Sequence, residues 1–338
     1  MLPLLQARVA RRAVTVLTGA RQTGKTTLVC DLLPRSDAPE TVYFSLDDPD
    51  ERLRLAADPV RRLDHGRRVV ILDEIQKQPA LLDAVKLLAD RRDGHRFLLL
   101  GSSQILLLEK VRETLAGRAS LLELWPLALA ERVDTPIVPA SGLDLVWRQG
   151  EVALQKLRRA SPPADEARRR ALADEHRFWG GYPALESLPE SDRKVWLQDF
   201  RRTYLERDLA DLGRVADLDQ FALAQNLLAA RTAQLLSYFE VARELGVAVN
   251  TVRRYLRFLE ISYQVFLLRP LVPTVTARLV KSPKLYWTDP GLARVLAGRT
   301  DADGPSSRPR CWASWCAGAP GRPIRRSCTS TGPAPAGK

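Results

Sequence analysis

The chain has 338 residues, of which 45% are hydrophobic, and its formal net charge is +12. This length allows two or three domains, and the hydrophobic content excludes global disorder. No apolar run approaches the roughly 20 residues that cross a bilayer, and Arg8, Arg11 and Arg12 interrupt any secretory leader. The charge favours polyanionic partners, above all nucleic acid, although an arginine-rich genome would produce the same surface.

Cysteine and histidine usage excludes a disulfide scaffold. Only Cys30 precedes residue 310, which is typical of a reducing cytosol and predicts a cytoplasmic protein. The histidines are scattered and the late cysteines lack the spacing of zinc ligands, so no metal site is assigned to them. These residues are His65, His95, His176, Cys311, Cys316 and Cys328.

The first predicted elements are a buried strand at 13–18 (AVTVLT) and a helix after Lys25 (TTLVCDLL). The stretch GARQTGKTTL lies between them and fits the phosphate-loop pattern G-x-x-x-x-G-K-[ST] in its required context. Lys25 can reach the β- and γ-phosphates of ATP, and the Thr26 hydroxyl can ligate Mg²⁺. The residues expected to bind the cofactor are Gly19, Ala20, Arg21, Gln22, Thr23, Gly24, Lys25, Thr26 and Thr27.

An acidic strand follows about fifty residues later. In RRVVILDEIQK (67–77), four consecutive apolar residues predict a strand of a parallel sheet that is buried on both faces. We expect Asp73, at its end, to hold Mg²⁺ through water. Glu74 is expected to be the catalytic base that orients and deprotonates the attacking water.

Three more strands are expected around these two. TVYFSLDD (41–48) precedes the acidic strand in the chain and is interpreted as the additional strand of NTPases that activate water with a carboxylate. FLLLGSSQ (97–104) ends near Ser102, which is either a sensor of the γ-phosphate or part of an ordinary turn. Arg118 precedes a fifth strand. It either stabilises γ-phosphate charge, in cis or from a neighbouring subunit, or forms a surface ion pair.

These motifs together resemble a family. LTGARQTGKTTL, VVILDEIQK, LLLGSSQ, LAGR and LELWPLALAE, with GGYPA (180–184), YLERDL (204–209) and KSPKLYWTDPGLA (281–293), are similar to bacterial and archaeal AAA-type ATPases with an uncharacterised C-terminal region. The resemblance covers residues 13 to about 298. It implies an α/β fold, with a P-loop NTPase core and parallel sheet followed by a helical lid and a winged-helix-like module, then an endonuclease-like region.

The expected domains follow the chain. They are an AAA-type ATPase core (1–135), a charged linker and helix (136–177), a helical lid over the nucleotide (178–235), a winged-helix-like module (236–298) and a disordered tail (299–338). After Asp303 the tail has no Asp, Glu, Leu or Val, so neither a packed core nor nuclease chemistry is expected there. The abrupt change of composition suggests a reading-frame shift or a truncation.

The stretch YFEVARELGVAVNTVRRYLRFLE (238–260) has a helix-turn-helix pattern. The second helix has an apolar stripe of Val252, Tyr255, Leu256 and Leu259. Ala248 stands where a capping serine is common. Off the stripe lie the candidate DNA contacts Arg253, Arg254 and Arg257. The alternative is that this module serves for packing or protein contact, as winged helices in ATPases often do.

The sequence thus predicts a Mg²⁺-dependent ATPase that couples nucleotide state to a DNA or protein partner. Two alternatives stay open. One is a nucleotide-gated switch on double-stranded DNA with little turnover, and the other is a protein-interaction scaffold that binds ATP for stability.

Overall fold

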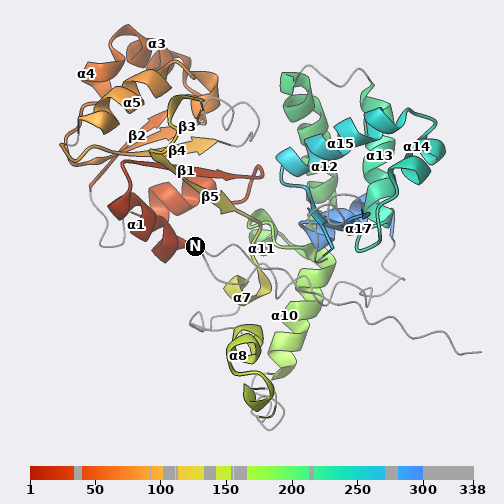
Figure 1. Ribbon diagram of the computed structural model, residues 1–338. Coiled ribbons are helices and arrows are strands. Elements are labelled where there is room, and N and C mark those ends of the chain that lie inside the picture. The colour runs from red at the N-terminus through yellow and green to blue at the C-terminus, as the bar shows by residue number, and fades with distance from the viewer. Residues whose placement is uncertain are drawn as a thin grey trace, which may run out of the picture.

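The computed structural model describes residues 1–33, 40–91, 93–101, 111, 113–132, 142–153, 155, 166–212, 217–270 and 281–299. An α/β unit occupies the N-terminal part, and a mainly helical unit follows from residue 166 (Figure 1). The predicted Ser102 and the predicted disordered tail, from residue 300 on, lie outside the described residues. No helix in the described part combines the length and the apolar character that crossing a bilayer requires.

The N-terminal unit is built on a five-stranded sheet in the order β2-β3-β4-β1-β5. Every pair of neighbouring strands is parallel. The strands are β1 (Val14–Gly19), β2 (Thr41–Ser45), β3 (Val69–Asp73), β4 (Arg96–Gly101) and β5 (Ala119–Leu124). Both β1 and β3 are buried along their whole length, as the continuous apolar runs in the sequence predict.

Helices cover both faces of this sheet, because side chains alternate between the faces along each strand. Val70 and Leu72 face one apolar cluster, and Val69 and Ile71 face the other. The first cluster lies under α3 (Pro49–Ala57), α4 (Pro59–Leu63) and α5 (Leu81–Asp90). The second lies under α1 (Leu2–Arg11) and the π-helical turn Leu28–Leu32, which follows the short α2 (Lys25–Thr27) (Figure 1).

The strand inserted between the phosphate-loop strand and the acidic strand is β4, not the one at 41–48. β2 forms the outer edge of the sheet beside β3, whereas β4 pairs with both β1 and β3. The interpretation of 41–48 as the additional strand was therefore wrong. Chain order does not determine the order of strands in a parallel sheet, because each connection crosses over a face of the sheet.

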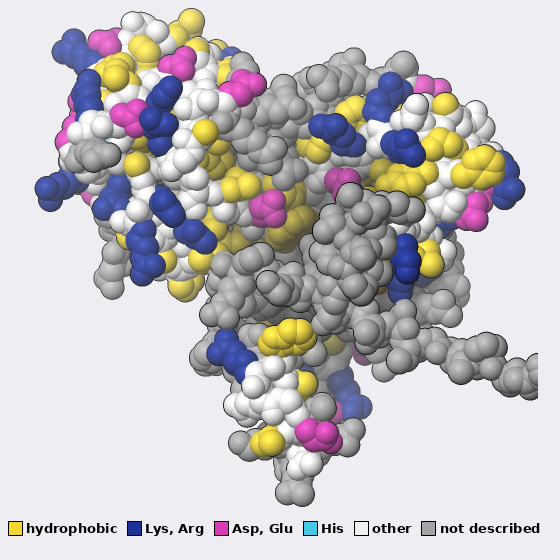
Figure 2. Space-filling model, in the orientation of Figure 1, with side chains coloured by type: hydrophobic (Ala, Val, Ile, Leu, Met, Phe, Trp, Pro, Cys, Tyr) yellow, Lys and Arg dark blue, Asp and Glu magenta, His cyan; other side chains and the backbone are white. Residues whose placement is uncertain are grey.

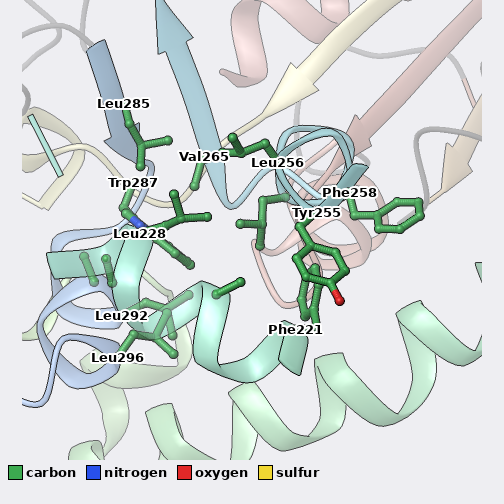
Figure 3. Packing of buried hydrophobic residues seen from close by; sticks show 14 of the residues in the cluster. Phe221, Leu228, Tyr255, Leu256, Phe258, Val265, Leu285, Trp287, Leu292 and Leu296 are labelled. Atoms are coloured by element: carbon green, nitrogen blue, oxygen red, sulfur yellow. The ribbon is translucent and has the colours of Figure 1, made fainter. Parts of the chain in front are cut away.

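The C-terminal unit shares one hydrophobic core between the expected lid and the expected winged-helix-like module. Its elements are α10 (Glu166–Trp179), α11 (Ala184–Ser187), α12 (Glu190–Leu212), α13 (Leu218–Ala230), α14 (Tyr238–Leu245), α15 (Val249–Ile261), β6 (Val265–Leu268), β7 (Lys284–Trp287) and α17 (Pro290–Leu296). Figure 3 shows Tyr255 of α15 against Phe221 of α13, with ring centroids 5.0 Å apart. The division at 235/236 stays a prediction. Two short helices, α7 (Leu129–Arg132) and α8 (Gly142–Gln149), precede this unit.

The helix-turn-helix pattern forms α14 and α15. Gly246 ends α14 with a φ of +67°, in the left-handed region where glycine is preferred. The four residues of the apolar stripe predicted for α15 are buried. Ala248 is the N-cap residue of α15 and forms no side-chain capping hydrogen bond, because a methyl group cannot accept one. The antiparallel pair β6 and β7 follows.

Candidate nucleotide-binding site

The phosphate loop leaves the sheet at Gly19 and ends at Gly24, where the next helix begins. A Cβ built on Gly19 would lie 2.1 Å from the carbonyl oxygen of Leu124, on the neighbouring strand β5. Gly24 has a φ of +85°, which side chains avoid. Backbone geometry therefore accounts for both glycines of the pattern.

Buried side chains shape the interior of this loop. The Lys25 ammonium donates to the carbonyl oxygens of Gly19 (3.1 Å) and Ala20 (2.7 Å). The buried Thr23 hydroxyl donates to the same oxygen of Ala20 at 2.8 Å. The cation of Lys25 thus lies along the inner wall of the loop. The other residues predicted to bind phosphates are the half-buried Arg21 and the exposed Gln22 and Thr27.

Asp73 joins the loop to the acidic strand. Its Oδ2 accepts a hydrogen bond of 3.1 Å from the Thr26 hydroxyl, across 47 positions of sequence. Its Oδ1 accepts from the backbone N–H of Glu74 at 2.9 Å. The two residues predicted to hold Mg²⁺ are therefore neighbours at the carboxyl edge of the sheet.

Tyr43 is a site residue that the sequence reasoning missed. Its hydroxyl donates to Oδ2 of Asp73 at 2.7 Å. Burial and this hydrogen bond raise the pKa of Tyr43, so the phenol stays protonated as a donor. In the register of β2 and β3, Ser45 lies beside Asp73, and Tyr43 shares the face of Ser45 two residues earlier. The period-two alternation within TVYFS was the available signal.

Glu74 turns the chain sharply after β3. Its φ of +55° is unusual for a residue with a side chain. The half-buried carboxylate accepts a hydrogen bond from the Gln76 amide. Glu74 therefore stands at the edge of the sheet next to Asp73, at the position predicted for the base.

The C-terminal unit reaches the phosphate loop through the segment 180–183. Pro183 packs on Gly24, since its Cγ lies 3.7 Å from the position of a Cβ built there. The Gly181 carbonyl accepts from the Leu127 backbone N–H at 2.7 Å, which ties the segment to the chain just beyond β5. The GGYPA motif is thus part of the surroundings of the loop.

Asp289 holds the same segment from the other side. It is fully buried, and its Oδ2 accepts from the Gly181 N–H at 2.7 Å. Its Oδ1 accepts from the Leu292 N–H at 2.8 Å, which caps α17. Burial raises the pKa of Asp289 to about 6, against the opposing effect of these backbone donors. Any side chain at Gly180 would collide with this carboxylate.

Arg118 does not belong to this site. It precedes Ala119, which pairs with Val14 at the amino end of β1, whereas the loop leaves the carboxyl end at Gly19. Five residues of strand separate the two edges by about 17 Å. Arg118 instead forms a two-point ion pair with Asp90, at 2.5 and 3.0 Å. This position contradicts a role in cis on the γ-phosphate, and Arg118 has the surface ion pair that was one alternative. A role on the γ-phosphate of a neighbouring subunit stays a prediction.

The three arginines of α15 lie apart from the nucleotide site and are exposed. Within the described residues, none of them forms an ion pair with an acid. Arg253 lies over the Tyr238 ring, 5.7 Å from its centroid, and its side chain has a polar contact of 3.4 Å to Asn250. Figure 2 shows Lys and Arg side chains over the region of α15. In the part of the chain that the structure describes, their guanidinium groups are exposed and lack an acidic partner.

Comparison with known proteins supports the division into two units. Residues 11–133 match the family of AAA domains, and residues 170–303 match a domain of unknown function, DUF8612. The Walker-type ATPase PABY2304 of Pyrococcus abyssi has the same fold, with a TM-score of 0.52 at 14% identity over 87% of this chain and 94% of that chain. The N-terminal unit is therefore similar to AAA domains and has the α/β fold of a P-loop ATPase.

Curated relatives are longer than this chain. It is 34% identical over 312 residues to the uncharacterized proteins Rv2008c of Mycobacterium tuberculosis and Mb2031c of Mycobacterium bovis. The match covers 92% of this chain and 62% of each relative. An uncharacterized protein of Methanocaldococcus jannaschii, MJ1544, is 19% identical over 297 residues.

Proposed function

We propose that this chain binds ATP with Mg²⁺ and hydrolyses it at the phosphate loop. The observation that carries the proposal is the hydrogen bond of 3.1 Å between Thr26 and Asp73. It brings the end of the loop and the end of the acidic strand together, although 47 positions separate them. A glycine-rich surface turn would have no reason to meet a buried carboxylate.

The residues at this junction fit Mg²⁺. A hydroxyl and a carboxylate are hard oxygen donors, and Mg²⁺ in nucleotide sites commonly takes one or two such donors besides phosphates and waters. Thr26 would ligate the ion and Asp73 would hold one of its waters. When bound, the ion neutralises charge on the β- and γ-phosphates.

Lys25 and Glu74 carry the remaining roles. The Lys25 ammonium stabilises phosphate charge from the inner wall of the loop, next to the backbone N–H groups. Glu74 orients a water molecule and takes its proton as the water attacks the γ-phosphate. Because Gln76 already donates to this carboxylate, the side chain of Glu74 has a defined orientation at the edge of the sheet.

A second candidate role concerns the partner. The exposed arginines of α15, without acidic partners in the described part of the chain, favour duplex DNA, because phosphates are the anions that such a helix face meets in helix-turn-helix proteins. On this proposal the β6–β7 pair is the wing of a winged helix, and nucleotide turnover at the N-terminal unit is coupled to DNA.

Phosphate release from ATP and Mg²⁺, with and without duplex DNA, tests these proposals together. Turnover that DNA accelerates supports a DNA-coupled ATPase. Tight DNA binding that depends on nucleotide, with negligible turnover, favours the switch. Nucleotide binding that raises the melting temperature, without turnover or DNA binding, favours the scaffold, and the absence of nucleotide binding contradicts all three.

A further inference from the structure

Tyr263, directly beyond the second helix of the helix-turn-helix, is anchored on the strand that feeds the phosphate loop. Its hydroxyl lies 2.5 Å from Oγ1 of Thr18, the residue before Gly19. The Trp125 ring, just after β5, meets the Tyr263 ring edge-on at 5.1 Å. Tyr263 is 1% exposed, so water does not compete for this contact.

The backbone of Tyr263 has an unusual conformation. The residue ends α15 in a Schellman turn: its own N–H donates to the Glu260 carbonyl at 3.1 Å, and the Gln264 N–H donates to Leu259 at 2.9 Å. Its φ is +62°, in the left-handed region where this turn normally has glycine and where a bulky side chain is strained. A tyrosine in such a place is expected only where its side chain is needed.

A second path leads from Tyr263 back to the phosphate loop. The Thr288 hydroxyl donates to the Tyr263 carbonyl at 2.7 Å. The next residue is Asp289, which holds Gly181 in the segment whose Pro183 packs on Gly24. Tyr263 thus connects to the beginning of the loop through Thr18 and to its end through this chain of contacts.

We propose that Tyr263 is a positioning residue that couples nucleotide binding at the phosphate loop to anion binding at α15. This inference rests on the proposed nucleotide binding. Ligand that orders the loop also orders Thr18 and Gly24, and the two paths pass that ordering to the end of α15. If bound nucleotide changes the affinity of α15 for an anion by some factor, thermodynamic linkage requires that the anion change the affinity for nucleotide by the same factor.

Hydrogen exchange of the full chain tests the proposal, with Mg²⁺ and a non-hydrolysable ATP analogue as the probe. In the native protein the analogue should slow exchange at residues 19–27 and, by about tenfold, at 258–264. Tyr263→Phe should keep the slowing at 19–27 and reduce it at 258–264, because the path through Thr18 is lost while the path through the Tyr263 carbonyl and Thr288 remains. Tyr255→Phe, which removes a hydroxyl from α15 without touching Thr18, is the matched control and should behave as the native protein.

Thr18→Val removes the Thr18 hydroxyl from the contact and keeps the shape of the side chain. This variant tests the proposal if the Tyr263 variant fails to fold. Like Tyr263→Phe, it should reduce the effect at 258–264. Full retention of that effect in either folded variant overturns the proposal. So does a native protein that slows exchange at 19–27 and not at 258–264. Absence of slowing at 19–27 instead shows that the proposed nucleotide site itself is wrong.

Discussion

The Tyr43 phenol and the Thr26 hydroxyl donate to the same oxygen of Asp73, at 2.7 and 3.1 Å. Two donors on one oxygen fix the direction of the carboxylate, so Asp73 is oriented toward the loop by a residue of the edge strand. Because Tyr43 lies on the neighbouring strand β2, a change there acts on Asp73, the proposed Mg²⁺ residue, without altering the loop.

Tyr43→Phe should weaken nucleotide binding in the presence of Mg²⁺ by roughly fivefold, about 1 kcal/mol, because Asp73 loses one of the donors that orient it. Affinity measured without Mg²⁺ should be unchanged. Titration with a fluorescent ATP analogue over a series of Mg²⁺ concentrations measures both. Tyr286→Phe, in the β6–β7 pair, is the control. Equal losses with and without Mg²⁺ would contradict an effect through Asp73.

Lys25→Ala should abolish measurable ATP binding, with a loss of at least about 100-fold, since the variant lacks the cation that stabilises the β- and γ-phosphates. The exposed Lys77, paired with Asp47 at 2.6 Å, provides the control Lys77→Ala. Because Lys25 also bonds the carbonyls of Gly19 and Ala20, thermal unfolding should confirm that the variant is folded. Unchanged ATP affinity in a folded Lys25→Ala variant would contradict the assignment of the phosphate loop.

Glu74→Gln should keep nucleotide affinity within about twofold and lower turnover by roughly 100-fold or more, the usual contribution of a general base. The amide can orient water and cannot take its proton. Binding is measured by titration and turnover by phosphate release, with Glu151→Gln, at an exposed position, as the control. Hydrolysis at the native rate would place the base elsewhere.

Replacing Arg253, Arg254 and Arg257 together by Ala should reduce the magnitude of the log–log salt slope of duplex DNA binding by about 2 to 3, or about 0.9 per phosphate contact. Sequence preference should change much less, because phosphate contacts position a protein without reading bases. Binding titrations at several salt concentrations give the slope. ATP hydrolysis without DNA should persist in this variant.

The control for that experiment removes the same charge from another surface. Arg61, Arg62 and Arg67 are exposed on the α/β unit, and their triple replacement by Ala should leave the slope unchanged. A form without residues 304–338, which carry basic residues and no acids, separates the contribution of that segment. If the α15 variant keeps the native slope, α15 is a packing or protein-contact helix.

His95 should make stability depend on pH. Burial disfavours its protonation, but hydrogen bonds to Asp64 (2.8 Å) and Asp93 outweigh burial and raise the pKa of His95. A raised pKa means that this stabilisation is complete below the unfolded-state value of about 6.5 and is lost as pH rises through the folded-state value.

Thermal unfolding of the native protein and of His95→Gln at pH 6 and pH 8 measures this effect. Relative to the variant, the native protein should lose stability between the two pH values. The buried His176, whose pKa burial lowers to about 4, acts in the opposite direction but equally in both proteins, so the difference reports on His95. An identical pH dependence of the two proteins would contradict the prediction.

The local parts of this molecule could be predicted from sequence, and the tertiary relationships could not. The loop, the acidic strand and the helix-turn-helix are contiguous patterns with defined backbone requirements, such as the left-handed Gly24 and Gly246. The position of β4 inside the sheet depends on crossover connections that no pattern encodes. Tyr43 and Tyr263 reach the site only after distant segments pack together.

Arg118 is another case in which a correct local prediction did not give the tertiary position of the residue. Its place before an apolar strand was read correctly, and β5 begins at the next residue. A parallel sheet, however, gathers ligands at the carboxyl ends of its strands, and a residue that precedes a strand lies at the opposite edge. The direction of β5 relative to β1 was the missing information, and it places Arg118 away from the phosphate loop of its own chain.

The strand order has a consequence for biosynthesis. β1 is made first, yet its two neighbours in the sheet are β4 and β5, and Gly19 pairs with Leu124, which is translated 105 residues later. At the usual ribosomal rate of about 5–20 residues per second, this fully buried strand waits roughly 5–20 s for its partners. During that interval the nascent chain presents an unpaired hydrophobic edge, so a chaperone that shields short apolar segments should increase the yield of folded protein.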